Sequence, residues 1–159
     1  MSSGPYMVLV VLGVLGTGLT AGVFVAFSSF VMRGLAALPP AQGVAAMQAI
    51  NSSATTVAFM ALFLGTAVLS AVIAVVTFVL WPGGTAPELL LGSVLYLAGA
   101  FGVTVVANVP RNEALAGLEP GSPEAVAYWP SYVREWTVWN HARVIASGGA
   151  TACYLAALV

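Results

Sequence analysis

Polar side chains that could do chemistry gather near the end of the chain, inside an otherwise apolar stretch. Trp136, Asn140, His141 and Arg143 occur there within eight residues. At about 100° per residue of α-helix, Trp136, Asn140 and Arg143 fall within about a 60° arc, whereas His141 points about 100° away from Asn140. A guanidinium and an amide on one face can bind the same anionic or carbonyl oxygen. We therefore expect Arg143 and Asn140 to converge on one ligand without His141.

Further amide side chains flank other apolar stretches, namely Gln48, Asn51, Asn108 and Asn112. Because successive membrane spans alternate in direction, these amides and the polar residues of the last stretch should lie on the same side of the bilayer. The sequence thus predicts a one-sided polar pocket. Trp136 and Tyr132 are placed to stack on a flat substrate there, or to form an ordinary aromatic belt.

Several of these residues also have a purely structural interpretation. Arg143 could snorkel to the lipid headgroups, because it lies near the start of its helix. Asn108 and Asn112 could cap the helix ends around Pro110. Site and structural roles are compatible for the asparagines, and the sequence leaves both open.

The residues that bind metals and haem are scarce. His141 is the one histidine and Cys153 the one cysteine, so a bis-histidine haem cannot form within one protomer. His–Met ligation would need Met32, Met47 or Met60 opposite His141. Cys153 can form neither an intrachain disulfide nor a thiolate metal site. We predict no metal and no cofactor, with haem as a lesser alternative.

The elements that must position these residues follow from composition. The 159 residues are 60% hydrophobic and carry four arginines, five glutamates and no other charged side chain, whereas about a quarter of a soluble protein is charged. Residues 1–32, 34–87, 89–110 and 144–159 are free of charge. Since about 20 apolar residues cross a bilayer, we predict one all-α integral membrane domain, a four-helix bundle. The absence of a basic run argues against nucleic acid and a polybasic lipid-binding surface.

The expected boundaries follow from charges and prolines. Arg33 ends the first span, and Pro39-Pro40 begins an amphipathic helix. Pro110 should end the third span, because it lacks a backbone donor and restricts the residue before it. Ser122 begins a short helix within the connector, and Ser131 caps the fourth span. The predicted elements are spans at about 5–32, 54–80, 88–107 and 132–158, with the connector at 108–131.

Arginines occur in the first and third connectors and not in the second. The positive-inside rule then places these two connectors in the cytoplasm and both termini outside, in what we expect to be a bacterial cytoplasmic membrane. Membrane lipid is therefore an expected partner. The small-xxx-small pattern of Gly18 and Gly22 predicts a homo-oligomer through the glycine-rich first span.

The motif Asn108-Val-Pro-Arg-Asn112-Glu-Ala-Leu, followed by Trp136-x-x-x-Asn140-His141-x-Arg143, resembles the anthrone oxygenase-like family of small four-helix membrane proteins. The first half is similar too, with a glycine-rich first helix, a Met32-Arg33 exit and Met47-Gln48-Ala-Ile-Asn51. The resemblance covers essentially the whole chain.

The resemblance implies oxidation of a small hydrophobic aromatic polyketide, an anthrone, to an anthraquinone with O₂ as co-substrate. Arg143 and Asn140, with Asn108 or Asn112, would stabilise the oxyanion. His141, or a water held by the asparagines, would accept the proton. Two alternatives stay open: a non-catalytic small-molecule-binding or carrier protein, and a haem or quinone redox protein.

Overall fold

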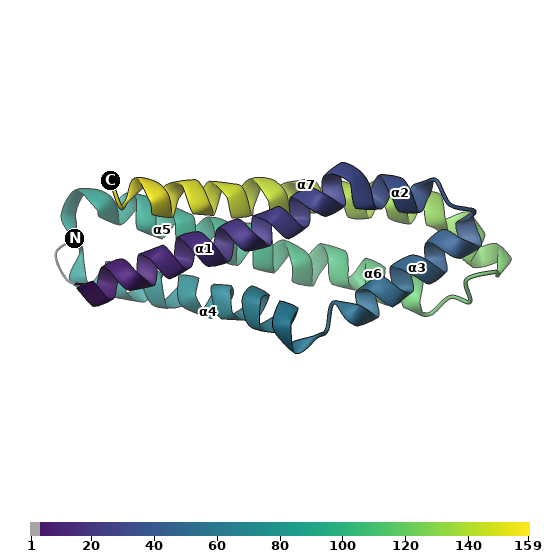
Figure 1. Ribbon diagram of the computed structural model, residues 1–159, viewed down its shortest axis with the longest axis horizontal. Coiled ribbons are helices and arrows are strands. Elements are labelled where there is room, and N and C mark those ends of the chain that lie inside the picture. Colours follow the sequence, from purple (N-terminus) through teal and green to yellow (C-terminus); the bar gives the residue numbers. More distant parts are fainter. Residues whose placement is uncertain (1–3) are drawn as a thin grey trace.

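Residues 4–159 are described by a computed structural model, and within them the chain is helical apart from short turns, with no β-strand (Figure 1). The α-helices are α1 (Gly4–Ala26), α2 (Met32–Ala36), α3 (Pro40–Ser53), α4 (Val57–Leu80), α5 (Ala86–Val94), α6 (Val109–Ala116) and α7 (Pro123–Ala156). Wider π-helical segments are η1 (Phe27–Val31), η3 (Leu95–Gly102) and η4 (Thr104–Asn108), and a 3-10 turn, η2 (Gly83–Thr85), precedes α5. The all-α prediction is confirmed.

The helices form an elongated bundle with two different ends (Figure 1). One end holds the C-terminus, the start of α1 and the turn between α4 and α5. The other end holds α2, α3, α6 and the start of α7. Of the predicted polar residues, Gln48, Asn51 and Asn112 lie on α3 and α6, whereas Asn140, His141 and Arg143 lie near the middle of α7. Three buried clusters follow one another along the bundle, around Tyr154, Tyr96 and Trp129.

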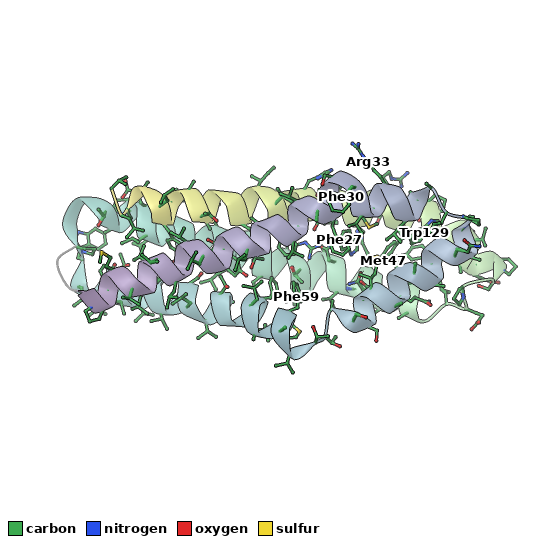
Figure 2. The ribbon with its side chains drawn as sticks, in the orientation of Figure 1. Phe27, Phe30, Arg33, Met47, Phe59 and Trp129 are labelled. Atoms are coloured by element: carbon green, nitrogen blue, oxygen red, sulfur yellow. The ribbon has the colours of Figure 1, made fainter. Side chains whose placement is uncertain are left out.

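The sequence suggested that the first helix ends at Arg33, but the helix continues beyond that residue. The helix is continuous from Gly4 to Ala36, because η1 adds one wide turn in which the Met32 N–H donates to the Phe27 carbonyl. Arg33 can remain helical because its side chain points away from the bundle (Figure 2). The predicted helix after Pro39 is confirmed as α3, with Pro40 at its first position.

Pro110 does not end the third helix either. The Val109 N–H donates to the carbonyl of Thr104, five residues back, so η4 widens the helix just before the proline. Pro110 then occupies the first turn of α6, where a backbone N–H is not required. The third membrane helix therefore reaches from Gly83 to Ala116, and the predicted end at residue 107 was wrong.

The last helix begins earlier than predicted. Ser122 caps α7 by accepting a hydrogen bond from the Ala125 N–H at 3.1 Å, and the helix then continues through Pro130 to Ala156. Ser131 does not cap it, since its hydroxyl donates to the Tyr128 carbonyl inside the helix. Ser122 therefore starts the last bundle helix itself, and the connector is reduced to residues 117–122.

Within residues 4–159, three helices are long and apolar enough to cross a membrane, namely Gly4–Ala36, Val57–Leu80 and Gly83–Ala116. Large apolar side chains cover their outer surface; Leu19, Phe78 and Val106 are more than 60% exposed, as expected of a surface that contacts lipid. α7 completes the bundle but is not among these helices, because it carries Glu124, Arg134, Glu135, Asn140, His141 and Arg143 along its length. The chain is an integral membrane protein. Its orientation in the bilayer stays a prediction.

Small residues allow the helices to approach closely, which is the main source of packing between helices in lipid. Cross-bundle hydrogen bonds add to it, including Tyr6 to Thr77 at 2.7 Å and Thr151 to Thr17 at 2.9 Å. A Cβ at Gly18 would lie 3.6 Å from Thr151 of α7, whereas one at Gly22 would meet no atom within 4 Å. Gly18 thus faces the bundle and Gly22 lies open, and self-association through them stays a prediction.

Gly99 gives a direct test of this packing. A Cβ at Gly99 would lie 2.5 Å from the Cβ of Ala146 on α7, so Gly99→Ala must push η3 and α7 apart and should destabilise the protein by about 1–3 kcal/mol. Gly148→Ala is the matched control, because a Cβ there meets nothing within 4 Å. The thermal midpoint in detergent should fall for Gly99→Ala and stay level or rise for Gly148→Ala. Equal midpoints would contradict the close contact.

Candidate functional site

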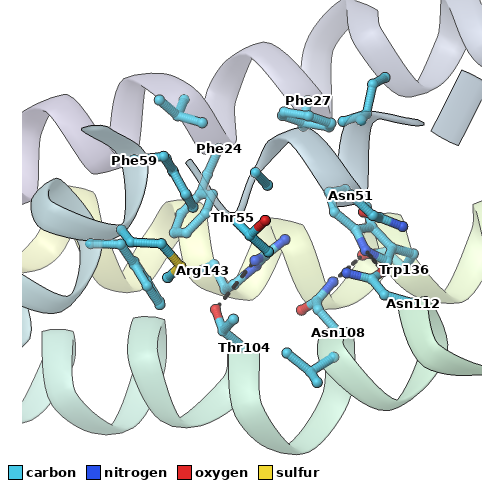
Figure 3. Close-up of a pocket in the computed structure, with 16 residues that line it drawn as sticks. Phe24, Phe27, Asn51, Thr55, Phe59, Thr104, Asn108, Asn112, Trp136 and Arg143 are labelled. Carbon is cyan, nitrogen blue, oxygen red and sulfur yellow. Dashed lines mark hydrogen bonds between the residues drawn. The ribbon is translucent and has the colours of Figure 1, made fainter. Parts of the chain in front are cut away.

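A cavity of about 190 Å³ opens near the middle of the bundle (Figure 3). Its walls come from α1 and η1, from the elbow between α3 and α4, from η4 and α6, and from α7. Most of the lining is apolar, and the polar lining groups are Asn51, Thr55, Thr104, Asn108, Asn112 and Arg143. The cavity lies between the buried clusters around Tyr96 and Trp129, and residues of both clusters contribute to its lining.

Arg143 is buried at the wall of this cavity, with only 5% of the residue exposed. Its Nη2 donates to Asn140 Oδ1 at 2.7 Å and its Nη1 to Thr104 Oγ1 at 3.2 Å. The guanidinium carbon lies 4.3 Å from the ring centre of Phe24 and 4.9 Å from that of Trp136, so cation–π contacts hold it on two sides. Arg143 therefore does not snorkel to the headgroups, and the snorkelling interpretation was wrong.

Asn140 holds Arg143 in place. Its Nδ2 donates to the Phe24 carbonyl at 2.8 Å and to Ser28 Oγ at 2.7 Å, while its Oδ1 accepts from Arg143. Both amide hydrogens are therefore used within the protein. The Asn140 and Arg143 side chains lie together, as the helical spacing predicted. Asn140 does not line the cavity, however, and contacts Arg143 on the side away from it.

The asparagines of the third helix also turn inward. Asn108 is fully buried and donates from Nδ2 to the Trp136 carbonyl at 3.3 Å. It makes no side-chain cap at the start of α6, so the capping interpretation of Asn108 was wrong. Asn112 Oδ1 accepts from the Tyr132 hydroxyl and from Trp136 Nε1, both at 2.9 Å. Arg143 does not bond directly to Asn51, Asn108 or Asn112, and its hydrogen-bond partner on the third helix is Thr104.

The predicted aromatic residues divide between two roles. Trp136 lines the cavity, with its ring centre 5.4 Å from that of Phe27. Tyr132 lies behind the lining, stacked on Trp129 and bonded to Asn112, and it accepts a long hydrogen bond of 3.4 Å from Asn51 Nδ2. Tyr132 therefore supports the cavity wall and does not itself line the cavity.

Gln48 and His141 lie outside the cavity. Gln48 Nε2 donates to the carbonyls of Leu115 and Leu118 at 2.9 and 2.8 Å, which fastens the end of α6 to α3. His141 is exposed and lines a separate groove together with Met32. Met47 belongs to the buried Trp129 cluster and Met60 to the central cavity. A His–Met haem would therefore have to use Met32, which is 2% exposed.

Two features of the cavity were not predicted from the sequence. One is Thr104, whose position four residues before Asn108 on the same helix was an available signal. The other is the aromatic lining, which includes residues far apart in the chain: Phe24, Phe27, Phe59 and Phe63. Nothing in their local sequence separates these phenylalanines from ordinary core residues.

Two polar atoms at the cavity wall keep unused hydrogen-bonding capacity. Asn108 Oδ1 and Arg143 Nε have no partner within residues 4–159, one an acceptor and the other a donor. No carboxylate or imidazole lies among the lining residues, and the described residues contain no group of three or more side chains suited to a metal ion. Asn108 and Arg143 both line the cavity, which thus presents a fixed positive charge and an amide to an uncharged or anionic ligand.

The comparison with known families agrees with the motif in the third and fourth helices. The family model for anthrone oxygenase matches residues 56–153, which is more than half of the chain and includes Thr104, Asn108, Asn112, Asn140 and Arg143. No curated protein and no solved structure matches the chain. The match includes the parts of α4, η4, α6 and α7 that line the cavity and supports an oxygenase-type function. The chain belongs to the anthrone oxygenase family.

Proposed function

We propose that the protein oxidises an anthrone to an anthraquinone with O₂ in the central cavity, without a metal or organic cofactor. The observation that carries the proposal is Arg143, a buried guanidinium that faces an aromatic cavity and has no carboxylate partner within residues 4–159. An unpaired buried charge is costly and is usually functional. A substrate oxyanion would supply the missing negative charge.

The shape and lining of the cavity favour a small flat substrate. A volume of about 190 Å³ is below the ~300 Å³ at which drug-sized sites begin, so part of a tricyclic substrate would extend outward. We take the elbow between α3 and α4 as the cavity mouth, because the lining residues Ala54 and Thr55 there are half-buried and exposed, respectively. The rings of Phe27 and Trp136 offer faces and edges for stacking. Asn108 Oδ1 can accept a hydrogen bond from a phenolic hydroxyl, while Arg143 donates to the neighbouring carbonyl oxygen.

The chemistry needs few protein groups. Loss of a proton from the benzylic methylene of an anthrone places negative charge on the carbonyl oxygen, where Arg143 stabilises it. That electron-rich anion passes one electron to O₂, and the two radicals combine into a peroxide at the former methylene carbon. Loss of water then gives the quinone. One anthrone and one O₂ thus yield one anthraquinone and one water, with no further reductant.

The proton acceptor in this scheme is a water at the cavity mouth. His141 cannot take the proton directly, because it lies along another groove. Asn51 and Thr55 line the mouth and can hold a water by hydrogen bonds. A substrate whose anion is well stabilised needs only a weak base, which is consistent with a cavity without carboxylates.

Membranes containing the protein should convert emodin anthrone to its quinone faster than matched membranes without it, with one O₂ consumed per quinone formed. The measurement is quinone absorbance together with an oxygen electrode, and removal of O₂ should stop the reaction. Ala54→Trp, which fills the mouth, is the control and should return the rate to background. A wild-type rate at background would contradict the proposal.

The absence of a side-chain base from the lining favours a second candidate, a protein that binds or carries the aromatic molecule without converting it. Saturable anthrone binding that Arg143→Leu removes, with no turnover by the wild type, would support the carrier. A Soret band in a dithionite-treated sample would instead support the haem alternative, through His141 and Met32.

A further inference from the structure

A second hollow of about 370 Å³ lies between the first and last helices, separate from the central cavity. Its walls come from η1 and α2 on one side and from α7 on the other. The lining residues are Ser28, Met32, Arg33, Ala36, Val133, Arg134, Thr137 and His141. We call this hollow the arginine groove. Nothing in the proposed oxidation uses it.

Folding brings two arginines from opposite ends of the chain into the arginine groove. Arg33 makes no ion pair within residues 4–159, and Arg134 has only a distant contact of 3.9 Å with Glu135. The other carboxylate oxygen of Glu135 is held by Arg111 at 3.0 Å. The groove therefore carries uncompensated positive charge, although the sequence contains no basic run.

Neutral hydrogen-bonding groups accompany the two arginines. Ser28, Thr137 and His141 line the same groove, and Thr137 Oγ1 has no partner within residues 4–159. Two guanidinium groups with hydroxyl and imidazole N–H or O–H groups form a donor set suited to the oxygens of a phosphate ester.

The surroundings of the groove favour a lipid over a soluble phosphate. On the two helical segments that form its walls, Phe30 of η1 and Val138 of α7 are 65% and 60% exposed. Arg33 and Arg134 are the next exposed residues beyond these two apolar side chains, about one helical turn further towards the end of the bundle. Figure 2 shows Arg33 pointing outward at this level, near Phe30. Apolar residues on one side and arginines on the other match the acyl chains and headgroup of one lipid.

We infer that the arginine groove is a binding site for the phosphate of an anionic phospholipid, whose acyl chains lie against Phe30 and Val138. Hydrogen bonds also connect the arginine groove to the central cavity. Ser28 lines the groove and accepts from Asn140, which in turn holds Arg143. A bound headgroup thus contacts the outer end of the hydrogen-bond chain that positions Arg143.

Native mass spectrometry of the detergent-purified protein can test the site by titration with phosphatidylglycerol and, separately, phosphatidylcholine. We expect one phosphatidylglycerol to bind at least about tenfold more tightly than phosphatidylcholine, and Arg33→Gln with Arg134→Gln to weaken it by about ten- to thirtyfold. Arg33→Lys with Arg134→Lys is the matched control, and it should keep most of the preference because the charge remains. Both side chains are exposed, so the fold should survive, which circular dichroism verifies.

Three results would overturn the inference. One is equal affinity for the two lipids, and another is unchanged phosphatidylglycerol affinity in the double glutamine variant. The third is displacement of the lipid by inorganic phosphate at equal concentration, which would make the groove a site for soluble anions. None of these measurements depends on oxygenase activity, so the site can fail or stand independently of the proposed function.

Discussion

Arg143→Leu is expected to keep the bundle folded and to lower anthrone turnover by about 100- to 1,000-fold, the usual effect of removing one oxyanion donor. Two opposing effects on stability explain the retained fold. A guanidinium in the membrane interior costs about 2.5–3.5 kcal/mol. Its removal leaves Asn140 Oδ1 without its partner, which costs about 1–3 kcal/mol. The net change in the free energy of unfolding should therefore be small.

Two further variants sharpen this result. Arg143→Lys should also be inactive, because an ammonium cannot reach Asn140 and Thr104 while presenting a planar donor group to the substrate. His141→Gln is the control on the same helix and should retain near wild-type turnover, since His141 lies outside the cavity. The assay is quinone absorbance above air oxidation, in membranes with equal amounts of each variant. A wild-type rate for Arg143→Leu, or an inactive His141→Gln, would place the chemistry elsewhere.

Asn140→Leu should lower kcat by about 100-fold, although Asn140 does not line the cavity, because small displacements of a catalytic group have effects of this size. Without Asn140 the guanidinium loses its shortest hydrogen bond, 2.7 Å, and the link from α7 to Phe24 and Ser28. The defect should appear in kcat more than in KM, because substrate contacts remain while the charge is misplaced. Stopped-flow quinone formation over a range of anthrone concentrations measures the two constants.

A double variant distinguishes positioning from general loss of structure. If Asn140 acts through Arg143, Asn140→Leu with Arg143→Leu should be no slower than Arg143→Leu alone. Gln48→Leu is a comparable loss of a half-buried, hydrogen-bonded amide, since Gln48 fastens α3 to α6 away from the cavity. It should lower the thermal midpoint and leave kcat nearly unchanged. Additive losses in the double variant, or an equally low kcat in Gln48→Leu, would show that Asn140 has only a structural role.

The sequence alone determined the properties that depend on composition and on spacing within one helix. Charge-free stretches long enough to cross a bilayer predicted the membrane bundle, and alternation of direction predicted that polar residues from different helices come together, as Asn51, Asn108, Asn112 and Arg143 do around the cavity. The helical period placed Asn140 beside Arg143 and turned His141 away from both. These relations hold because neighbouring positions on one helix have a fixed angle between them, whatever the helix packs against.

Only the tertiary structure decided which side chains meet across helices. The partner of Arg143 is Thr104, the helix continues through Pro110, and Arg33 lies beside Arg134 in one groove. Each depends on how far one helix is rotated and shifted against another. Contacts between small residues such as Gly99 and Ala146, and the wide π-helical turns η1 and η4, set those rotations. Periodicity within a single helix carries no information about them, because the phase between two helices is fixed only when their surfaces pack together.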